Sequence, residues 1–67
     1  MVISYQKLWK TLEKRKMTKK DLARRAGISD STIRVMTRGG YVSLEVLGRI
    51  CAALHADIGD IAQFLDV

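Results

Sequence analysis

The chain has 67 residues, no proline, one cysteine, and twelve Lys and Arg residues against seven Asp and Glu residues. This length is enough for one domain with a small core, residues 1–67, and a single cysteine excludes an intrachain disulfide or a Cys-X-X-Cys metal site. No apolar run reaches the roughly 18 residues of a membrane span, and the N-terminus lacks the apolar stretch of a signal peptide. We expect a cytoplasmic protein without membrane contact and, because apolar residues do not alternate over any length, an all-α fold.

The first predicted helix runs from about Tyr5 to Lys16, and Ser4 is suited to cap it. Its apolar residues recur at helical spacing and form one stripe: Tyr5, Leu8, Trp9 and Leu12. Because Trp9 lies on this stripe, core packing is favoured over stacking on a base. Three cations, residues 14–16, crowd the last turn, where they complement the helix dipole or contact phosphate groups.

The segment Met17–Gly39 predicts two short helices joined by a tight turn. Thr18 is suited to cap the first helix, and Asp21 follows three residues later in the capping-box position. Gly27 comes where this helix must stop, because glycine reaches the left-handed conformation without a Cβ penalty.

The second helix of this segment is predicted over Asp30–Arg38, with Ser29 as its N-cap. Its inward side chains, together with one from the turn, are Ile28, Ile33 and Met36. This is the layout of a helix-turn-helix, whose second helix enters the major groove of DNA.

The segment resembles the Cro-and-phage-repressor type of helix-turn-helix domain, often called the XRE family. The residues that carry the resemblance are Thr18, Leu22, Ala23, Gly27, Ser29, Ser31, Thr32, Ile33 and Gly39. The resemblance implies a compact five-helix bundle over nearly the whole chain and binding of double-stranded DNA. Two departures, Lys19 where relatives often have Gln and Asp30 where many have an uncharged polar residue, concern base preference rather than fold.

Two more helices are predicted after the loop Gly39–Val42. Ser43 caps the fourth helix, which runs from Leu44 to about Leu54, and Asp57 caps a last helix from Ile58 to about Leu65. The inward residues of these two helices are predicted to be Leu44, Leu47, Ile50, Cys51, Leu54, Ile58, Ile61, Ala62 and Leu65.

The distribution of charge favours DNA as the partner of the N-terminal half. Eleven of the twelve basic residues lie in residues 1–38 beside three acids, whereas residues 39–67 hold one arginine and four acids. A basic half that coincides with a helix-turn-helix pattern indicates a face that binds a polyanion. The predicted DNA-binding residues are Thr18, Lys19, Ser29, Asp30, Ser31, Thr32, Arg34, Val35, Arg38 and Tyr41.

The roles of these residues follow from their chemistry. Arg34 and Arg38 can pair bidentately with guanine, and Val35 offers an apolar surface to a thymine methyl group. Asp30 either stabilises the start of its helix or accepts a hydrogen bond from cytosine. Tyr41 either packs back on the core or donates to a phosphate. We expect a small transcriptional regulator, simplest as a repressor that blocks its site.

Apolar residues left over near the C-terminus predict a homodimer. The residues assigned to this contact are Ile61, Phe64 and Val67. One recognition helix covers only a few base pairs, and two-fold pairing doubles the site. In the competing interpretation Phe64 folds into the core of one chain. The alternative function is a protein-interaction module, antitoxin-like or a phage regulatory partner, that uses the same fold with Phe64 and the acidic half.

The sequence offers no arrangement typical of catalysis, of a metal site, of a cofactor or of a small-molecule ligand. It has no paired carboxylates and no Gly-rich phosphate loop. Cys51 falls on the core stripe of its helix as a small hydrophobic residue, and His55 suits the end of that helix as a cation. We therefore expect no enzyme activity.

Overall fold

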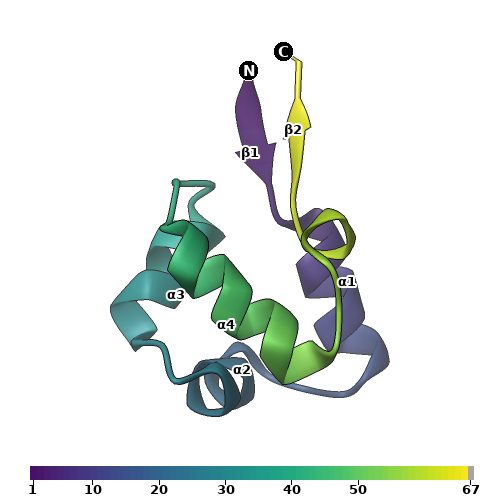
Figure 1. Ribbon diagram of the computed structural model, residues 1–67, viewed down its shortest axis with the longest axis vertical. Coiled ribbons are helices and arrows are strands. Elements are labelled where there is room, and N and C mark those ends of the chain that lie inside the picture. The colour runs from purple at the N-terminus through teal and green to yellow at the C-terminus, as the bar shows by residue number, and fades with distance from the viewer. Residues whose placement is uncertain (67) are drawn as a thin grey trace.

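The computed structural model describes residues 1–66. Four α-helices, a single 3₁₀ turn and a two-stranded sheet make up this part of the chain (Figure 1). In chain order they are β1 (Val2–Ser4), α1 (Gln6–Lys14), α2 (Lys19–Ala26), α3 (Asp30–Thr37), α4 (Leu44–Leu54), η1 (Ile58–Asp60) and β2 (Gln63–Leu65). The first four predicted helices are therefore present, whereas the fifth helix of the expected all-α bundle is not.

The two strands pair antiparallel and bring the ends of the chain together in a ribbon, defined here as β1 with β2. Ile3 lies opposite Phe64, in register with the flanking pairs Val2–Leu65 and Ser4–Gln63. Figure 1 shows this ribbon extending from the helices at one end of the molecule. Strand β2 of the ribbon replaces the end of the predicted fifth helix, because its backbone forms hydrogen bonds with β1. No local sequence pattern indicates a partner so distant along the chain.

The predicted inward residues of that last segment separate in the structure. Ile61 is fully buried, but Ile58 and Leu65 are exposed. An inward helical stripe from Ile58 to Leu65 is therefore wrong, since η1 is one turn long and β2 alternates its side chains.

Helix α1 begins and ends inside its predicted bounds. Tyr5 occupies the N-cap position, and the Ser4 hydroxyl accepts only a 3.3 Å bond from the Gln6 N–H, because Ser4 belongs to β1. The helix stops at Lys14, and Lys16 takes a left-handed conformation with φ of 56°. The Met17 N–H then donates to the Leu12 carbonyl at 2.9 Å, which turns the chain toward α2.

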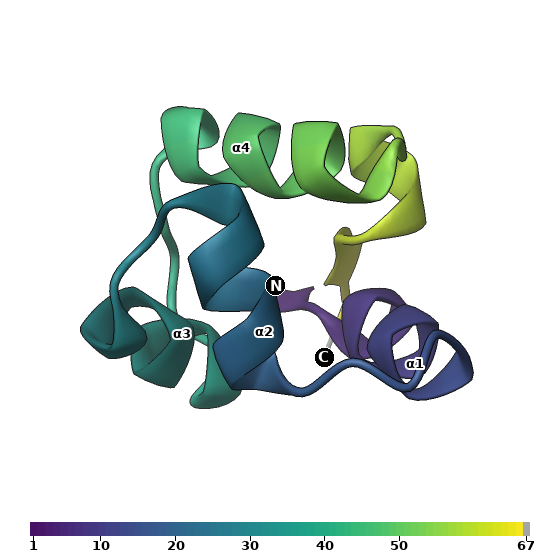
Figure 2. The same cartoon turned by 90° about the horizontal axis from the view of Figure 1, so that it is seen from below.

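The core lies between α4 and the other helices. Figure 2 shows α4 along one side of the molecule with α2 beside it, and these two helices pack against each other. The fully buried side chains of largest volume are Leu8, Leu22, Met36, Ile50, Leu54 and Ile61. Leu44 was expected among the inward residues and is instead 74% exposed, because at the first position of α4 it lies beyond the edge of this core.

Candidate nucleic-acid interface

The N-terminus of α2 is closed by the predicted capping box. The Thr18 hydroxyl accepts from the Asp21 N–H at 3.0 Å, and the Asp21 carboxylate accepts from the Thr18 N–H at 3.0 Å. That backbone bond is the main cause that lowers the pKa of Asp21, and the Thr18 hydroxyl lowers it further. Asp21 therefore stays ionised and fixes the entry into α2.

The turn between α2 and α3 follows the predicted layout. Gly27 has φ of 69°, and its carbonyl accepts a 3.4 Å bond from Arg49 of α4. The Ser29 hydroxyl accepts from the Thr32 N–H at 3.2 Å and so caps α3. Ile28, in the turn, packs against the core and so fixes the position at which α3 begins.

Helix α3 buries one side and exposes the other, as predicted. Ile33 and Met36 are buried, while Arg34 and Arg38 are exposed. The remaining predicted contacts on α3 divide into the exposed residues Asp30 and Ser31 and the half-buried residues Thr32 and Val35. The exposed side carries two guanidinium groups with no carboxylate within 4 Å in residues 1–66.

Val35 is less free than its predicted role requires. A Cβ built on Gly40 would come within 2.8 Å of the Val35 side chain, so the glycine lets the loop after α3 pass close to this helix. The Gly40 N–H donates to the Val35 carbonyl at 2.9 Å. Part of the Val35 side chain therefore packs against the loop, and only the remainder is exposed to a binding partner.

The loop after α3 is tied to the start of α1. The buried Tyr5 hydroxyl donates to the Gly40 carbonyl at 2.8 Å, and burial is the main cause that raises the pKa of Tyr5. Tyr41 follows and is 65% exposed, with its ring centroid 6.5 Å from that of Phe64 in β2. Of the two alternatives for Tyr41, packing into the core is wrong, because most of its side chain is exposed.

Lys19 links three helices. Its Nζ lies 4.3 Å from the centroid of the Trp9 ring in α1 and donates to the Thr37 hydroxyl of α3 at 3.0 Å. Trp9 and Thr37 were not among the predicted site residues. No local pattern indicates the contact, because its three members come from three separate helices.

These residues form one surface, here called the helix-turn-helix surface: the N-terminus of α2, the exposed side of α3 and the loop 39–42. Three further exposed cations of α2, absent from the predicted set, are Lys20, Arg24 and Arg25. Arg49–Glu45, at 3.0 Å, is the only ion pair within residues 1–66. The exposed cations of α2 and α3 therefore have no ion-pair partner in the described part of the chain.

A family model described as the Cro/C1-type helix-turn-helix DNA-binding domain matches residues 7–66. The chain belongs to this Cro/C1-type family. The resemblance predicted from residues 18–39 is thus confirmed over nearly the whole chain.

Among solved structures, the form II crystal structure of the transcriptional regulator VanUg is similar to this Cro/C1-type domain. The TM-score is 0.93 at 42% sequence identity, over 98% of this chain and 88% of that chain. No curated protein matches the chain by sequence. The fold is therefore shared with a transcriptional regulator.

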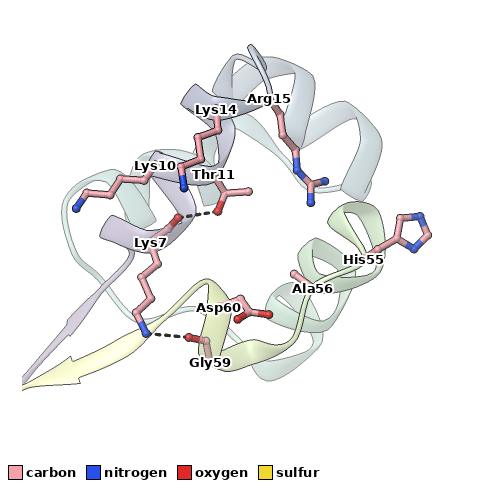
Figure 3. A pocket seen from close by; sticks show the side chains of 9 residues that line it. All are labelled: Lys7, Lys10, Thr11, Lys14, Arg15, His55, Ala56, Gly59 and Asp60. Atoms are coloured by element: carbon pink, nitrogen blue, oxygen red, sulfur yellow. Dashed lines mark hydrogen bonds between the residues drawn. The ribbon is translucent and has the colours of Figure 1, made fainter.

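A second group of cations in the Cro/C1-type domain lies on the other side of α1. Lys7, Lys10, Lys14 and Arg15 border a hollow of about 500 Å³, here called the α1 hollow, opposite Gly59 and Asp60 of η1. Lys7 Nζ donates to the Gly59 carbonyl at 3.1 Å, and Figure 3 shows Lys14 and Arg15 directed toward the hollow. This side of α1 faces η1, whereas the Trp9 side faces α2.

The residues predicted for the dimer contact do not share one environment. Phe64 is 60% exposed, so the interpretation in which it folds into the core of one chain is wrong. Ile61 is fully buried and packs within one chain, which leaves it no surface to offer to a second. Val67 lies outside the described residues.

Residues 1–66 contain no group of three His, Cys, Asp or Glu side chains placed to hold a metal ion. None of the helices in this part of the chain has the length and apolar character needed to cross a membrane. Cys51 is half-buried against the core, and burial is the main cause that raises the pKa of its thiol. His55 ends α4 in a left-handed conformation with φ of 54°.

Proposed function

We propose that this Cro/C1-type domain binds double-stranded DNA in a sequence-specific manner and represses transcription by occupying its site. The observation that carries the proposal is the exposed side of α3, where Arg34 and Arg38 have no acidic partner among residues 1–66 and the caps at both ends of the turn fix the helix. Membership of a DNA-binding family and likeness to a transcriptional regulator support it. We expect the protein to act in the cytoplasm, where it would meet a chromosomal or phage operator.

The mechanism divides the surface by chemistry. The two arginines of α3 read base edges in the major groove, and the partly exposed Val35 meets a thymine methyl group. Lys19 and the hydroxyls of Thr18, Ser29, Ser31 and Thr32 contact phosphates at the helix N-termini, where the positive ends of the dipoles favour anions. Asp30 stabilises the start of α3 or accepts from cytosine, and Tyr41 donates to a phosphate.

We propose further that two copies bind two half-sites as a homodimer through the ribbon. The large apolar side chains exposed in residues 1–66 are Met1, Val2, Tyr41, Leu44, Ile58, Phe64 and Leu65. All except Leu44 lie on the ribbon, at its N-terminal end, in η1 or in the loop next to the ribbon. A two-stranded sheet has two free edges and gains stability when more strands or another apolar surface cover it.

Sedimentation equilibrium with Phe64→Glu tests the dimer, and Leu44→Glu is the matched control because it places the same charge on an exposed leucine of α4, which is not part of the ribbon. We expect the wild type and Leu44→Glu to associate, and Phe64→Glu to stay monomeric. A wild type that stays monomeric at high concentration and binds DNA without cooperativity contradicts the homodimer.

The exposed Phe64 also favours the alternative of a protein-interaction module. Selection of bound sequences from a random DNA pool separates the two functions. We expect enrichment of a site with two half-sites about one helical turn apart. If no sequence is enriched and no duplex binds at low salt, the DNA-binding function is wrong and the ribbon becomes the surface to study.

A further inference from the structure

The ammonium group of Lys19 is held in place by two other helices. Its Nζ donates to the Thr37 hydroxyl at 3.0 Å, and the Thr37 hydroxyl donates in turn to the Ile33 carbonyl at 2.9 Å. Because a hydroxyl has one proton to donate, Thr37 Oγ1 accepts from Lys19. The face of the Trp9 ring lies 4.3 Å from the same Nζ.

The Trp9 ring is itself fixed. It is half-buried against the core, and the Tyr5 ring meets it in an edge-to-face arrangement with centroids 6.4 Å apart and planes at 64°. Tyr5 is anchored through its hydroxyl to the Gly40 carbonyl. The ring therefore offers Lys19 a rigid π face rather than a mobile one.

The contact holds Lys19 without neutralising its charge. No carboxylate of residues 1–66 lies within 4 Å of Nζ, although Glu13 borders the same small hollow between α1 and α2. An ammonium has three N–H donors, of which Thr37 takes one. The remaining donors and the full positive charge are available at the N-terminus of α2.

We propose that Trp9 is a positioning residue for DNA binding, which holds the Lys19 ammonium between α2 and α3 so that it meets a phosphate already oriented. A lysine side chain otherwise loses considerable rotamer freedom when it binds. This inference rests on the proposed DNA-binding function and adds to it a residue that touches no DNA. Thr37 shares the task through its hydroxyl.

A double-mutant cycle tests the proposal. DNA affinity is measured for the wild type, Trp9→Leu, Lys19→Gln and the double variant, with Trp9→Phe as the conservative variant that keeps a π face. Thermal unfolding of each variant is recorded in parallel. We expect Trp9→Leu to weaken binding about two- to five-fold, Trp9→Phe to weaken it less, and Lys19→Gln to reduce the salt dependence by about one charge.

The cycle separates positioning from a purely structural role. If Trp9 acts through Lys19, Trp9→Leu has no further effect in the Lys19→Gln background. Equal losses in both backgrounds, or equal losses for Trp9→Phe and Trp9→Leu, overturn the proposal while leaving DNA binding intact. A wild type that binds no duplex overturns the proposed function itself, and this inference with it.

Fluorescence gives a second readout, since Trp9 is the only tryptophan of the chain. We expect duplex DNA to change the Trp9 emission of the wild type, because a phosphate that binds the Lys19 ammonium changes the charge beside the Trp9 ring. The same titration of Lys19→Gln, at concentrations that saturate it, is expected to change the emission little. An equal change in both proteins shows that Trp9 senses DNA without Lys19 and contradicts the proposal.

Discussion

Basic side chains gather on two surfaces that lie on opposite sides of α1. The helix-turn-helix surface includes the N-termini of α2 and α3, whereas the α1 hollow is bordered by the C-terminal ends of α1 and α4 and by the Asp60 carboxylate. Helix N-termini favour anions and helix C-termini favour cations. In the hollow, Lys14 and Arg15 lie at the C-terminal end of their own helix, where the helix dipole favours cations.

The comparison shows why net charge alone does not locate a DNA-binding surface. Both groups come from the basic N-terminal half of the chain. The helix dipoles, however, add to the attraction for phosphate on one surface and oppose it on the other. Whether residues 14–16 stabilise their helix or contact phosphate stays a prediction, and the position of Lys14 and Arg15 at the C-terminal end of α1 favours helix stabilisation.

Among substitutions on the two surfaces, Arg34→Ala is expected to have the largest effect on DNA affinity. If Arg34 pairs with a guanine, its loss weakens binding to the preferred site by about 1–3 kcal/mol and relaxes the preference at one base pair. Fluorescence anisotropy with the selected duplex and with duplexes altered at single positions measures this. Equal weakening on every duplex assigns Arg34 to a phosphate instead.

The next effect concerns the cap that directs α3. Ser29→Ala removes the hydroxyl that accepts from the Thr32 N–H and is expected to lower the free energy of unfolding by about 1 kcal/mol. Ser43→Ala is the matched control, because Ser43 caps α4 in the same way. Urea denaturation should show similar losses for both variants, and only Ser29→Ala should also weaken DNA binding. Equal DNA affinities for the two variants contradict a separate role for the α3 cap.

A smaller effect is expected from the capping box of α2. The folded-state pKa of Asp21 is lowered, so its contribution is fully present above the ordinary carboxyl pKa and is lost as the pH falls through the lowered value. Thermal unfolding of the wild type and Asp21→Asn from neutral pH down to about pH 2 measures this contribution. The two melting temperatures should converge in acid. A constant gap across this range contradicts the role of the ionised carboxylate.

The smallest effect is expected in the α1 hollow. The pair Lys10→Gln with Lys14→Gln removes the same charge as Arg34→Gln with Arg38→Gln. We expect less than about a two-fold change in DNA affinity from the hollow pair at moderate salt, because cations beyond a Debye length from the duplex are largely screened. A loss as large as that of the α3 pair would make the hollow part of the DNA surface.

The parts of the fold that could be predicted are those encoded by near neighbours. Each helix end is marked within three or four residues, by Thr18 with Asp21, by Gly27 and by Ser29. The sequence therefore predicts α2, the turn and α3 almost to the residue. The ribbon pairs Ile3 with Phe64 across nearly the whole chain, and no local period reports such a partner. A short apolar segment such as Ile58–Leu65 fits a helix as well as a turn followed by a strand.

The candidate site divides in the same way. The exposure of Arg34 and Arg38 follows from helical spacing around Ile33 and Met36. The contact of Lys19 with Trp9 depends on how α1 packs against α2 and was not predictable from spacing. Helical spacing places Val35 on the exposed side of α3, whereas the close approach of the Gly40 loop covers part of its side chain.

The salt dependence of DNA binding tests the central claim most directly. Affinity for the selected duplex is measured at several salt concentrations for the wild type, the Lys10→Gln/Lys14→Gln variant and the Arg34→Gln/Arg38→Gln variant. With about 4–6 phosphates neutralised per subunit, the slope of log affinity against log salt should be roughly −4 to −5 per subunit for the first two proteins. The α3 variant should bind more weakly with a shallower slope. A wild-type slope near zero, or binding lost in the hollow variant and kept in the α3 variant, contradicts the helix-turn-helix surface as the site of DNA binding.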